Sequence, residues 1–338
     1  MRILGLSFGF HDAGACMLQD DNIEFAGHSE RYSKKKNDPN FCQGLLDDVL
    51  EYGPDVVAYY ERPWLKQLRQ WYAGQGIEWN KVTTTQILKQ QLGVAQVSGK
   101  RIKNYNHHLC HAAAGFQTSP YPIATVVVID AVGEWDTVSI WGAMYDKNFK
   151  ATYTRLWSQS YPHSIGLFYS AITQRIGLHP LDEEYITMGM AGWGTPQWTE
   201  VMRDALVENS EQLQFKQNLH TGLDAEFLGH ATNEDIAASA QQLTEYLIHQ
   251  VMTRAKNFGW SDNLVYMGGV ALNCLANRRL GEYFDNIWIM PCPGDAGSSL
   301  GAAALAYGGC VQWTSAGLGR NIPGDYPVDS AMAALLRD

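Results

Sequence analysis

Residues 124–137 read ATVVVIDAVGEWDT, a run of β-branched residues that ends in a turn containing Asp and Gly. Such a run predicts a buried strand, and the alternation that follows it as far as Thr154 predicts returning strands. Residues 3–18 follow the same scheme of apolar strand, glycine-containing turn and returning strand, and residues 22–28 alternate as a third strand. Because this hairpin, of a kind that cradles phosphates, is built twice, the sequence predicts a duplicated α/β fold with two similar lobes.

Helical and strand patterns alternate along the rest of the chain, as in α/β proteins. Helices are expected at residues 41–52, 63–71, 164–176, 233–258 and 298–307, and strands at 56–60, 263–267 and 287–290. Asn233 is expected to cap the long helix and Gly259 to end it. Residues 181–196 are rich in Gly and Met and are expected to form a loop that lines a site.

Composition limits the class of protein. The chain has 338 residues, of which 46% are apolar, and this is enough for a large core. A net charge of -10 without a Lys/Arg stripe argues against binding to a nucleic-acid duplex, although a nucleotide in a pocket remains compatible. No apolar stretch reaches membrane-spanning length, no secretory leader precedes the first strand, and the six cysteines form no CxxC pair. We therefore expect a cytoplasmic protein with reduced thiols and no membrane contact.

Residues 106–116, NHHLCHAAAGF, predict a helix with a metal site. His107 and His111 stand four residues apart, so both imidazoles project from one helical face within reach of one cation. Asp295, at the loop-to-helix start PGDAG, offers a carboxylate as a third ligand. The alternative is a core helix in which histidines cluster by chance. Cys110 lies off the shared face, and the pair lacks the adjacent Glu of an H-E-x-x-H zinc protease.

Two glycines, Gly268 and Gly269, follow the strand at 263–267 and precede a helix start. Without side chains they let a flat or anionic ligand approach the backbone, with helix-end amides pointing at it. Asn273 and Asn277 follow four residues apart, so on one helix both amides reach the same ligand. The alternative is that these asparagines cap the helix or face solvent.

Several motifs together resemble one family. The segments HHLCHAAAGF, IDAVGEWDT, PHSIGLFYSAIT, EEYITMGMA, GGVALNCLAN and PGDAGSSLGAA, with HDAGACML and SERYSKKKND near the start, resemble the NodU/CmcH family of O-carbamoyltransferases. The resemblance covers nearly the whole chain. It implies a Kae1-like domain of the actin/Hsp70/sugar-kinase superfamily over residues 1–325, with lobes of roughly 1–120 and 121–325 around a nucleotide and metal cleft.

The resemblance also implies an activity. Such a domain holds iron or a similar divalent ion and transfers a carbamoyl group from carbamoyl adenylate to a hydroxyl of a small molecule, sugar or nucleoside. A separate YrdC-like domain makes the adenylate from carbamoyl phosphate and ATP. Residues 326–338 stand where the family continues into that domain, so we expect it in cis or as a partner in trans. A homodimer remains open.

Residue roles follow from the same resemblance. It implies that His107, His111 and Asp295 hold the metal, and that Asp130 contacts the adenylate or a metal-linked water unless its role is structural. The expected nucleotide contacts are Gly133, Glu134, Gly268, Gly269, Asn273 and Asn277. His11 and Asp12 are candidates for orienting and deprotonating the acceptor hydroxyl, and His11 is preferred because an unperturbed His has a pKa of about 6.5. The stretch expected to hold substrate phosphate oxygens comprises Glu30, Arg31, Lys35 and Lys36.

Two other functions remain compatible with this sequence. One is threonylcarbamoyl transfer to tRNA, as in Kae1 proteins proper, and the other is a non-catalytic nucleotide- and metal-binding module that depends on a partner. The acidic balance and the GEW and PHS motifs favour O-carbamoyl transfer over the tRNA reaction. Ser29 stands where the family usually has Glu, which leaves the acceptor open.

Overall fold

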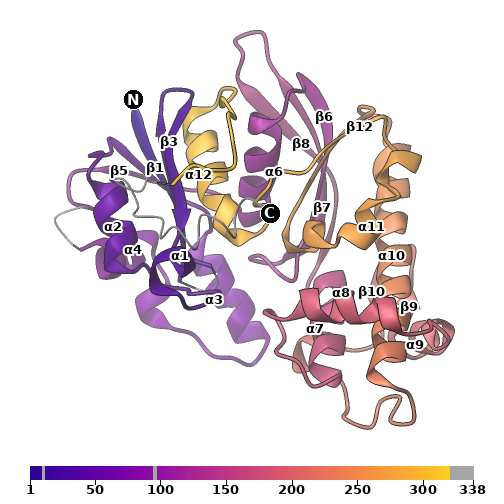
Figure 1. Cartoon of the computed structure of the whole chain (residues 1–338). Coiled ribbons are helices and arrows are strands. Elements are labelled where there is room, and N and C mark those ends of the chain that lie inside the picture. The colour runs from indigo at the N-terminus through magenta and orange to yellow at the C-terminus, as the bar shows by residue number, and fades with distance from the viewer. Residues whose placement is uncertain (10–11, 94–96, 320–338) are drawn as a thin grey trace, which may run out of the picture.

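The computed structural model describes residues 1–9, 12–93 and 97–319, and in it two five-stranded sheets enclose a pair of helices (Figure 1). The strand orders are β3-β2-β1-β4-β5 and β12-β11-β6-β7-β8. In each sheet an antiparallel three-stranded meander continues into two parallel strands. The two sheets therefore share one topology, and the predicted duplicated α/β fold is confirmed.

The strands of the two sheets lie close to their expected positions, except β5, which the sequence analysis did not predict. Those of the first sheet are β1 (Arg2–Ser7), β2 (Gly14–Gln19), β3 (Asn22–His28), β4 (Val56–Tyr59) and β5 (Arg101–Asn104). Those of the second are β6 (Ile123–Ile129), β7 (Asp136–Tyr145), β8 (Ala151–Ser160), β11 (Asn263–Met267) and β12 (Asn286–Trp288). The expected strand at 287–290 is shorter, because only the first residues of that segment pair with β11.

The apolar run of β6 is continuous because both faces of the second sheet are covered. Val126 and Val128 belong to the core between the two sheets, whereas Val127 and Ile129 belong to the core on the outer face. Successive side chains of a strand point to opposite faces, so covering both faces requires apolar residues at every position. The outer core is completed by α7 (Ile165–Arg175) and α10 (Asn233–Asn257).

Two helices fill the space between the sheets, α6 (His107–Thr118) and α12 (Ser298–Tyr307). α6 packs on β6 and β11 of the second sheet, and α12 packs on β1, β2 and β4 of the first. A Cβ atom at Gly301 of α12 would lie 1.8 Å from the backbone oxygen of Cys110, so only glycine permits this approach. The expected boundary near residue 120 separates the two sets of strands, but α12, from the second half of the chain, covers the first sheet.

Smaller elements complete the described chain. The first half holds α1 (Glu30–Ser33), α2 (Gln43–Leu50), α3 (Pro63–Tyr72), η1 (Trp79–Lys81) and α4 (Thr84–Leu92). The second half holds α8 (Glu184–Met190), η2 (Ala191–Trp193), α9 (Thr199–Leu206), β9 (Val207–Asn209), β10 (Gln214–Phe215), η3 (Leu219–Thr221), η4 (Gly269–Leu272), α11 (Cys274–Asn277), η5 (Leu280–Glu282) and η6 (Asp295–Gly297). Among the described helices none is both long and apolar enough to cross a bilayer.

Two local predictions are wrong. Residues 181–196 contain α8 and η2 rather than a loop, because the buried Thr187 bonds Thr173 of α7 and docks the segment as a helix. The cap of α10 is Thr232, whose hydroxyl accepts from the backbone N–H of Asp235, whereas the Asn233 amide donates to the Ile176 carbonyl. Residues 326–338, where the family is expected to continue into a YrdC-like domain, lie outside the described residues.

Candidate metal centre and ligand pocket

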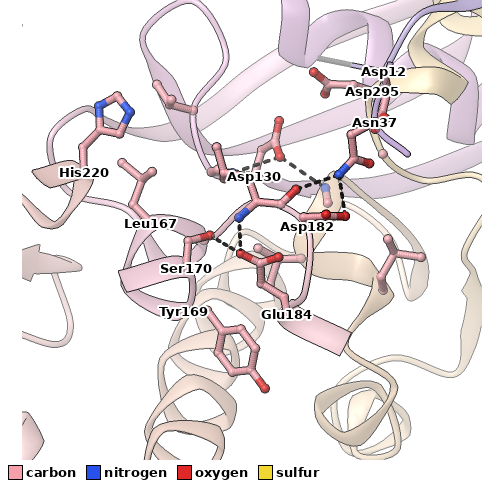
Figure 2. Close-up of a pocket in the computed structure, with 18 of the residues that line it drawn as sticks. Asp12, Asn37, Asp130, Leu167, Tyr169, Ser170, Asp182, Glu184, His220 and Asp295 are labelled. Atoms are coloured by element: carbon pink, nitrogen blue, oxygen red, sulfur yellow. Dashed lines mark hydrogen bonds between the residues drawn. The ribbon is translucent and has the colours of Figure 1, made fainter. Parts of the chain in front are cut away.

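A cavity of about 530 Å³ opens where loops from both sheets meet (Figure 2). Asp130 follows β6, Gly269 follows β11, Asp12 precedes β2 and Asp295 precedes α12, and all four line the cavity. Ligands of open α/β sheets bind in such a crevice beyond the strand ends. The fold therefore brings residues that are far apart in the sequence to one cavity.

Four side chains form one cluster of possible metal ligands, His107, His111, Asp130 and Asp295, and the two carboxylates of this cluster line the cavity. The Nε2 atoms of the two histidines lie 3.1 Å apart, and the distances from these atoms to Asp130 Oδ2 and Asp295 Oδ1 run from 3.1 to 3.6 Å. Neighbouring ligands of one cation, each about 2.1 Å from it, are separated by similar distances. The predicted ligands His107, His111 and Asp295 thus converge, and Asp130 joins them.

The start of α6 orients the two imidazoles. The Asn106 side chain caps the helix by accepting from the backbone N–H of Leu109 at 2.9 Å. His107 Nδ1 lies 2.9 Å from Glu61 Oε1, and His111 Nδ1 lies 3.0 Å from the Pro293 carbonyl oxygen. Both partners are acceptors, so each Nδ1 donates a hydrogen bond to its partner and the Nε2 atoms of both rings face the two carboxylates and each other. A divalent cation takes the place of the protons held on Nε2, so the donor set fits a divalent metal.

The charges of the cluster are strongly coupled. Burial alone would lower the pKa of His107, but the charge of Asp295 and hydrogen bonds to the surrounding carboxylates outweigh burial and hold that pKa well above its usual range. The pKa of His111 is also raised: burial opposes the shift, and hydrogen bonds to Asp130 and Asp295 prevail. Burial would raise the pKa of Asp130, but its hydrogen bonds to both histidines lower it well below the usual value. Both carboxylates therefore stay ionised and available to a cation.

Glu61 is a member of the site that the sequence analysis missed. It is fully buried after β4, and its carboxylate contacts Lys66 Nζ at 2.8 Å as well as His107. Such carboxylate–histidine pairs orient metal ligands and raise their basicity. The available signal was a charged residue placed directly after the apolar strand Val56–Tyr59.

The predicted nucleotide contacts Gly133 and Glu134 do not line the cavity. The β6–β7 turn folds over the start of α6, so a Cβ atom at Gly133 would lie 2.7 Å from His107 Cδ2. Glu134 is buried, and its carboxylate binds the Arg62 guanidinium and the Asn106 amide. The structure corrects these two assignments, because both residues support the metal-binding helix rather than a ligand.

The glycine pair lies beside the cluster. Gly268 has a φ of +93°, and a Cβ atom there would lie 2.2 Å from the Ile129 oxygen, so the turn requires glycine. Gly269 lines the cavity and donates its N–H to Asp130 Oδ1 at 3.3 Å. Asn273 also lines the cavity, with its amide paired to Gln241. Asn277 is not part of the cavity wall, because its amide turns back to the Ala271 carbonyl at 2.7 Å, so the expected pair of amides on one ligand is corrected to Asn273 alone.

The two acid–base candidates fare differently. Asp12 lines the cavity, and Figure 2 shows it beside Asp295. His11 lies outside the described residues. Asp12 is therefore the predicted acceptor-side residue that the structure places at the site.

The basic stretch makes contacts different from those expected. Lys36 lines the cavity, but Glu30, Arg31 and Lys35 do not. Glu30 accepts from the backbone N–H of Asn37, Arg31 donates to the imidazole of His28, and Lys35 is exposed. Lys36 pairs with Asp182 at 2.8 Å, and Asn37 donates to the same carboxylate at 3.0 Å (Figure 2). The stretch thus ties the loop before α2 to the segment before α8. The assignment to phosphate binding is corrected for Glu30, Arg31 and Lys35, which do not line the cavity.

Comparison with known proteins identifies a family. The sequence model described as Carbamoyltransferase N-terminus matches residues 61–304. An uncharacterized protein of Synechocystis sp. is 33% identical over 90% of this chain and 57% of its own length. Nodulation protein NolNO of Sinorhizobium fredii is 25% identical over 87% of this chain and 46% of its own length. The chain thus spans about half the length of these relatives.

Solved structures with a similar arrangement include two proteins of low identity. The activator of the 2-hydroxyisocaproyl-CoA dehydratase from Clostridium difficile, with bound ADPNP, has a TM-score of 0.48 at 15% identity and covers 91% of this chain and 94% of its own. Full-length HypF, in a phosphate- and nucleotide-bound form, has a TM-score of 0.48 at 13% identity and covers 90% of this chain and 55% of its own.

Proposed function

The chain belongs to the carbamoyltransferase family, and we propose that it transfers a carbamoyl group from carbamoyl adenylate to a hydroxyl of a small molecule, sugar or nucleoside. The observation that carries this proposal is the convergence of His107, His111, Asp130 and Asp295 in one donor cluster, whose two carboxylates line the cavity together with Gly269. A buried donor set that meets a ligand cavity favours a cation that acts on the ligand.

The donor set suits iron or a similar divalent cation, since two imidazoles and two carboxylates also accept zinc, manganese or cobalt. Such a cation supplies Lewis acidity to a carbonyl oxygen when it is bound. Glu61 and Pro293 keep the two imidazoles in the tautomer that presents Nε2. Arg62 and Glu134 hold the turn over α6, so the ligand side chains are fixed before substrate arrives.

On the nucleotide side, Gly269 admits the adenylate close to the backbone, and Asn273 faces it from the start of α11. On the acceptor side, Asp12 orients the hydroxyl and takes its proton, with His11 as the other candidate. The acceptor oxygen then bonds to the carbamoyl carbon while the bond from that carbon to the adenylate phosphate oxygen breaks. The products are a carbamate ester and AMP, and the proton passes to the base.

The supply of the adenylate is a separate part of the proposal. We assign its synthesis from carbamoyl phosphate and ATP to a YrdC-like domain, either joined to this chain or acting in trans. The described residues hold one ligand cavity next to the donor cluster, which suits the transfer step.

The test is metal content together with AMP binding, measured by elemental analysis and calorimetry. The wild-type chain should bind about one ion per chain and bind AMP more tightly with the ion than without it. His107→Ala/His111→Ala should lose both properties. The control is His230→Ala, outside the cavity lining. Absence of a bound ion, or AMP binding that is indifferent to both histidines, would reject the transferase mechanism.

A further inference from the structure

Arg69 on α3 is a buried cation, and no carboxylate of the described residues pairs with its charge. Arg69 is 4% exposed, and its guanidinium forms no salt bridge with the described part of the chain. Its Nε and Nη1 atoms have no hydrogen-bond partner among the described residues. Burial lowers the pKa of Arg69, and the nearby charge of Glu61 offsets part of that effect. A buried charge without a partner is strongly destabilising, so this guanidinium calls for an anion that the described part of the chain does not supply.

The surroundings of Arg69 form part of the cavity wall. The cavity is lined on this side by three residues of α3, Lys66, Arg69 and Gln70, and by Gln75, which follows the helix. Gln70 also has a buried side-chain oxygen without a partner. Because the two ends of an amide can exchange by a flip, Gln70 can present its N–H₂ group to the cavity. Two neighbouring side chains of one wall thus hold unsatisfied polar groups.

The second half of the chain supplies the aromatic residues next to Arg69. The Arg69 guanidinium stacks over the ring of Tyr161 at 5.5 Å, and the same ring contacts the imidazole of His220 at 5.9 Å. His220 lines the cavity, and Figure 2 shows it on the other side of Asp130 from Asp12 and Asp295. Burial, followed by the charge of Arg69, lowers the pKa of His220, so the ring is a neutral hydrogen-bonding partner at neutral pH.

Hydrogen bonds connect the metal cluster both to the glycine pair and to α3. Contacts run from the Gly269 N–H to Asp130, from Asp130 to His107, from His107 to Glu61 and from Glu61 to Lys66. Arg69 lies three residues, about one helical turn, beyond Lys66. Arg69 is thus near the part of the cluster held by Glu61, whereas Gly269 contacts Asp130, so a ligand held at Arg69 is near a different part of the cluster from one held at Gly269.

We propose that Arg69, with Gln70 and His220, forms an oxyanion subsite for the acceptor, so that the acceptor is a hydroxyl compound carrying a carboxylate or a phosphate group. The guanidinium matches the planar geometry of either anion and donates charge-assisted hydrogen bonds to it. The acidic group then anchors the acceptor, and its hydroxyl is directed toward the cluster. This inference rests on the proposed carbamoyl transfer and narrows its substrate class.

The test uses calorimetry on the metal-loaded chain with four probes: D-glycerate, glycerol 3-phosphate, neutral glycerol and AMP. The wild-type chain should bind one or both acids and discriminate against glycerol. Arg69→Gln should weaken binding of the acids by roughly 10- to 100-fold and leave AMP binding unchanged. Arg69→Lys, which keeps the charge, should retain part of the acid affinity and guards against a loss of fold in the first variant.

The matched control is Arg175→Gln, since the Arg175 guanidinium donates to the Phe227 carbonyl and does not line the cavity. Equal loss of AMP affinity in Arg69→Gln would mean that Arg69 holds the nucleotide phosphate and would overturn the acceptor assignment. Acids that bind no better than glycerol, or equally well to Arg69→Gln, would also overturn it. The two proposals can also fail separately. If the acids bind and need Arg69, but AMP binding to the wild-type chain does not depend on metal, the subsite is upheld and the proposed transferase reaction is rejected.

Discussion

Lys36 Nζ lies 2.8 Å from Asp182 Oδ1, so a loop of the first sheet is tied to the segment that begins α8 in the second half of the chain. Both residues line the cavity. Lys36 also lies over the Tyr185 ring at 4.3 Å, and Asn37 donates to the Leu181 carbonyl. These contacts join the two halves of the chain at the wall of the cavity.

Replacing Asp182 by Asn should therefore change ligand kinetics more than stability. An exposed pair of this kind contributes at most about 1 kcal/mol, so unfolding should barely shift. Loss of the tie should speed dissociation of a fluorescent AMP analogue by roughly two- to fivefold in stopped-flow measurements. Asp262→Asn, which removes an exposed pair with Lys256 outside the cavity lining, serves as the control. An unchanged dissociation rate would show that the Lys36–Asp182 pair does not restrain the ligand.

Glu61→Gln should weaken metal binding while the chain stays folded. The amide can still meet His107 Nδ1 but no longer carries the charge that makes the imidazole a stronger donor. Removal of such a partner typically lowers metal affinity by about 10- to 100-fold. Competition with a chelator of known affinity measures the effect, and Glu78→Gln, from an exposed pair with Lys81, is the control. Wild-type affinity in Glu61→Gln would exclude the assigned role.

The different outcomes for Asp130 and Glu134 show what the sequence could predict. The hairpin, the strand and the two histidines on α6 depend on local periodicity, and each lies where it was expected. Asp130 is at the end of the strand, so its position follows from the strand alone. Glu134 lies four residues later, and the reversal of the chain at the turn directs it to Arg62 rather than to a ligand.

Glu61 and Arg69 could not be assigned from local pattern for a different reason. Glu61 acquires its role only because β4 ends beside α6, and Arg69 only because α3 packs against Tyr161. Both contacts join segments more than 40 residues apart, as the 46-residue separation of Glu61 and His107 shows. Composition and spacing carry no information on contacts between such distant segments. A family resemblance predicts these contacts only for residues whose role in the family is already known.

Metal binding should release protons at neutral pH. The raised pKa values of His107 and His111 mean that the metal-free imidazoles still hold protons above the usual pKa of histidine, and a cation on Nε2 displaces them. We expect roughly one to two protons released per ion near pH 7, fewer as the pH rises through the raised pKa values, and weaker metal binding at lower pH. Calorimetry in buffers of different ionisation enthalpy counts these protons. A binding enthalpy that is independent of the buffer would show that the metal-free imidazoles hold no displaceable proton on Nε2 and would contradict this prediction.

Gly301→Ala should destabilise the whole fold, because α12 and α6 touch at this point. The added Cβ would lie 1.8 Å from the Cys110 oxygen, and neither backbone can move without shifting the helix that carries His107 and His111 or the helix that covers β1. Overpacking of a tight core costs about 1–3 kcal/mol and occasionally more, so we expect a loss of at least this size in the free energy of unfolding measured with urea. Gly281→Ala is the matched control, since a Cβ there meets nothing within 4 Å. If both variants unfold at the same urea concentration, α6 and α12 do not approach as closely as described. If Gly301→Ala alone is destabilised, its metal affinity should fall as well, because the same displacement moves the two imidazoles.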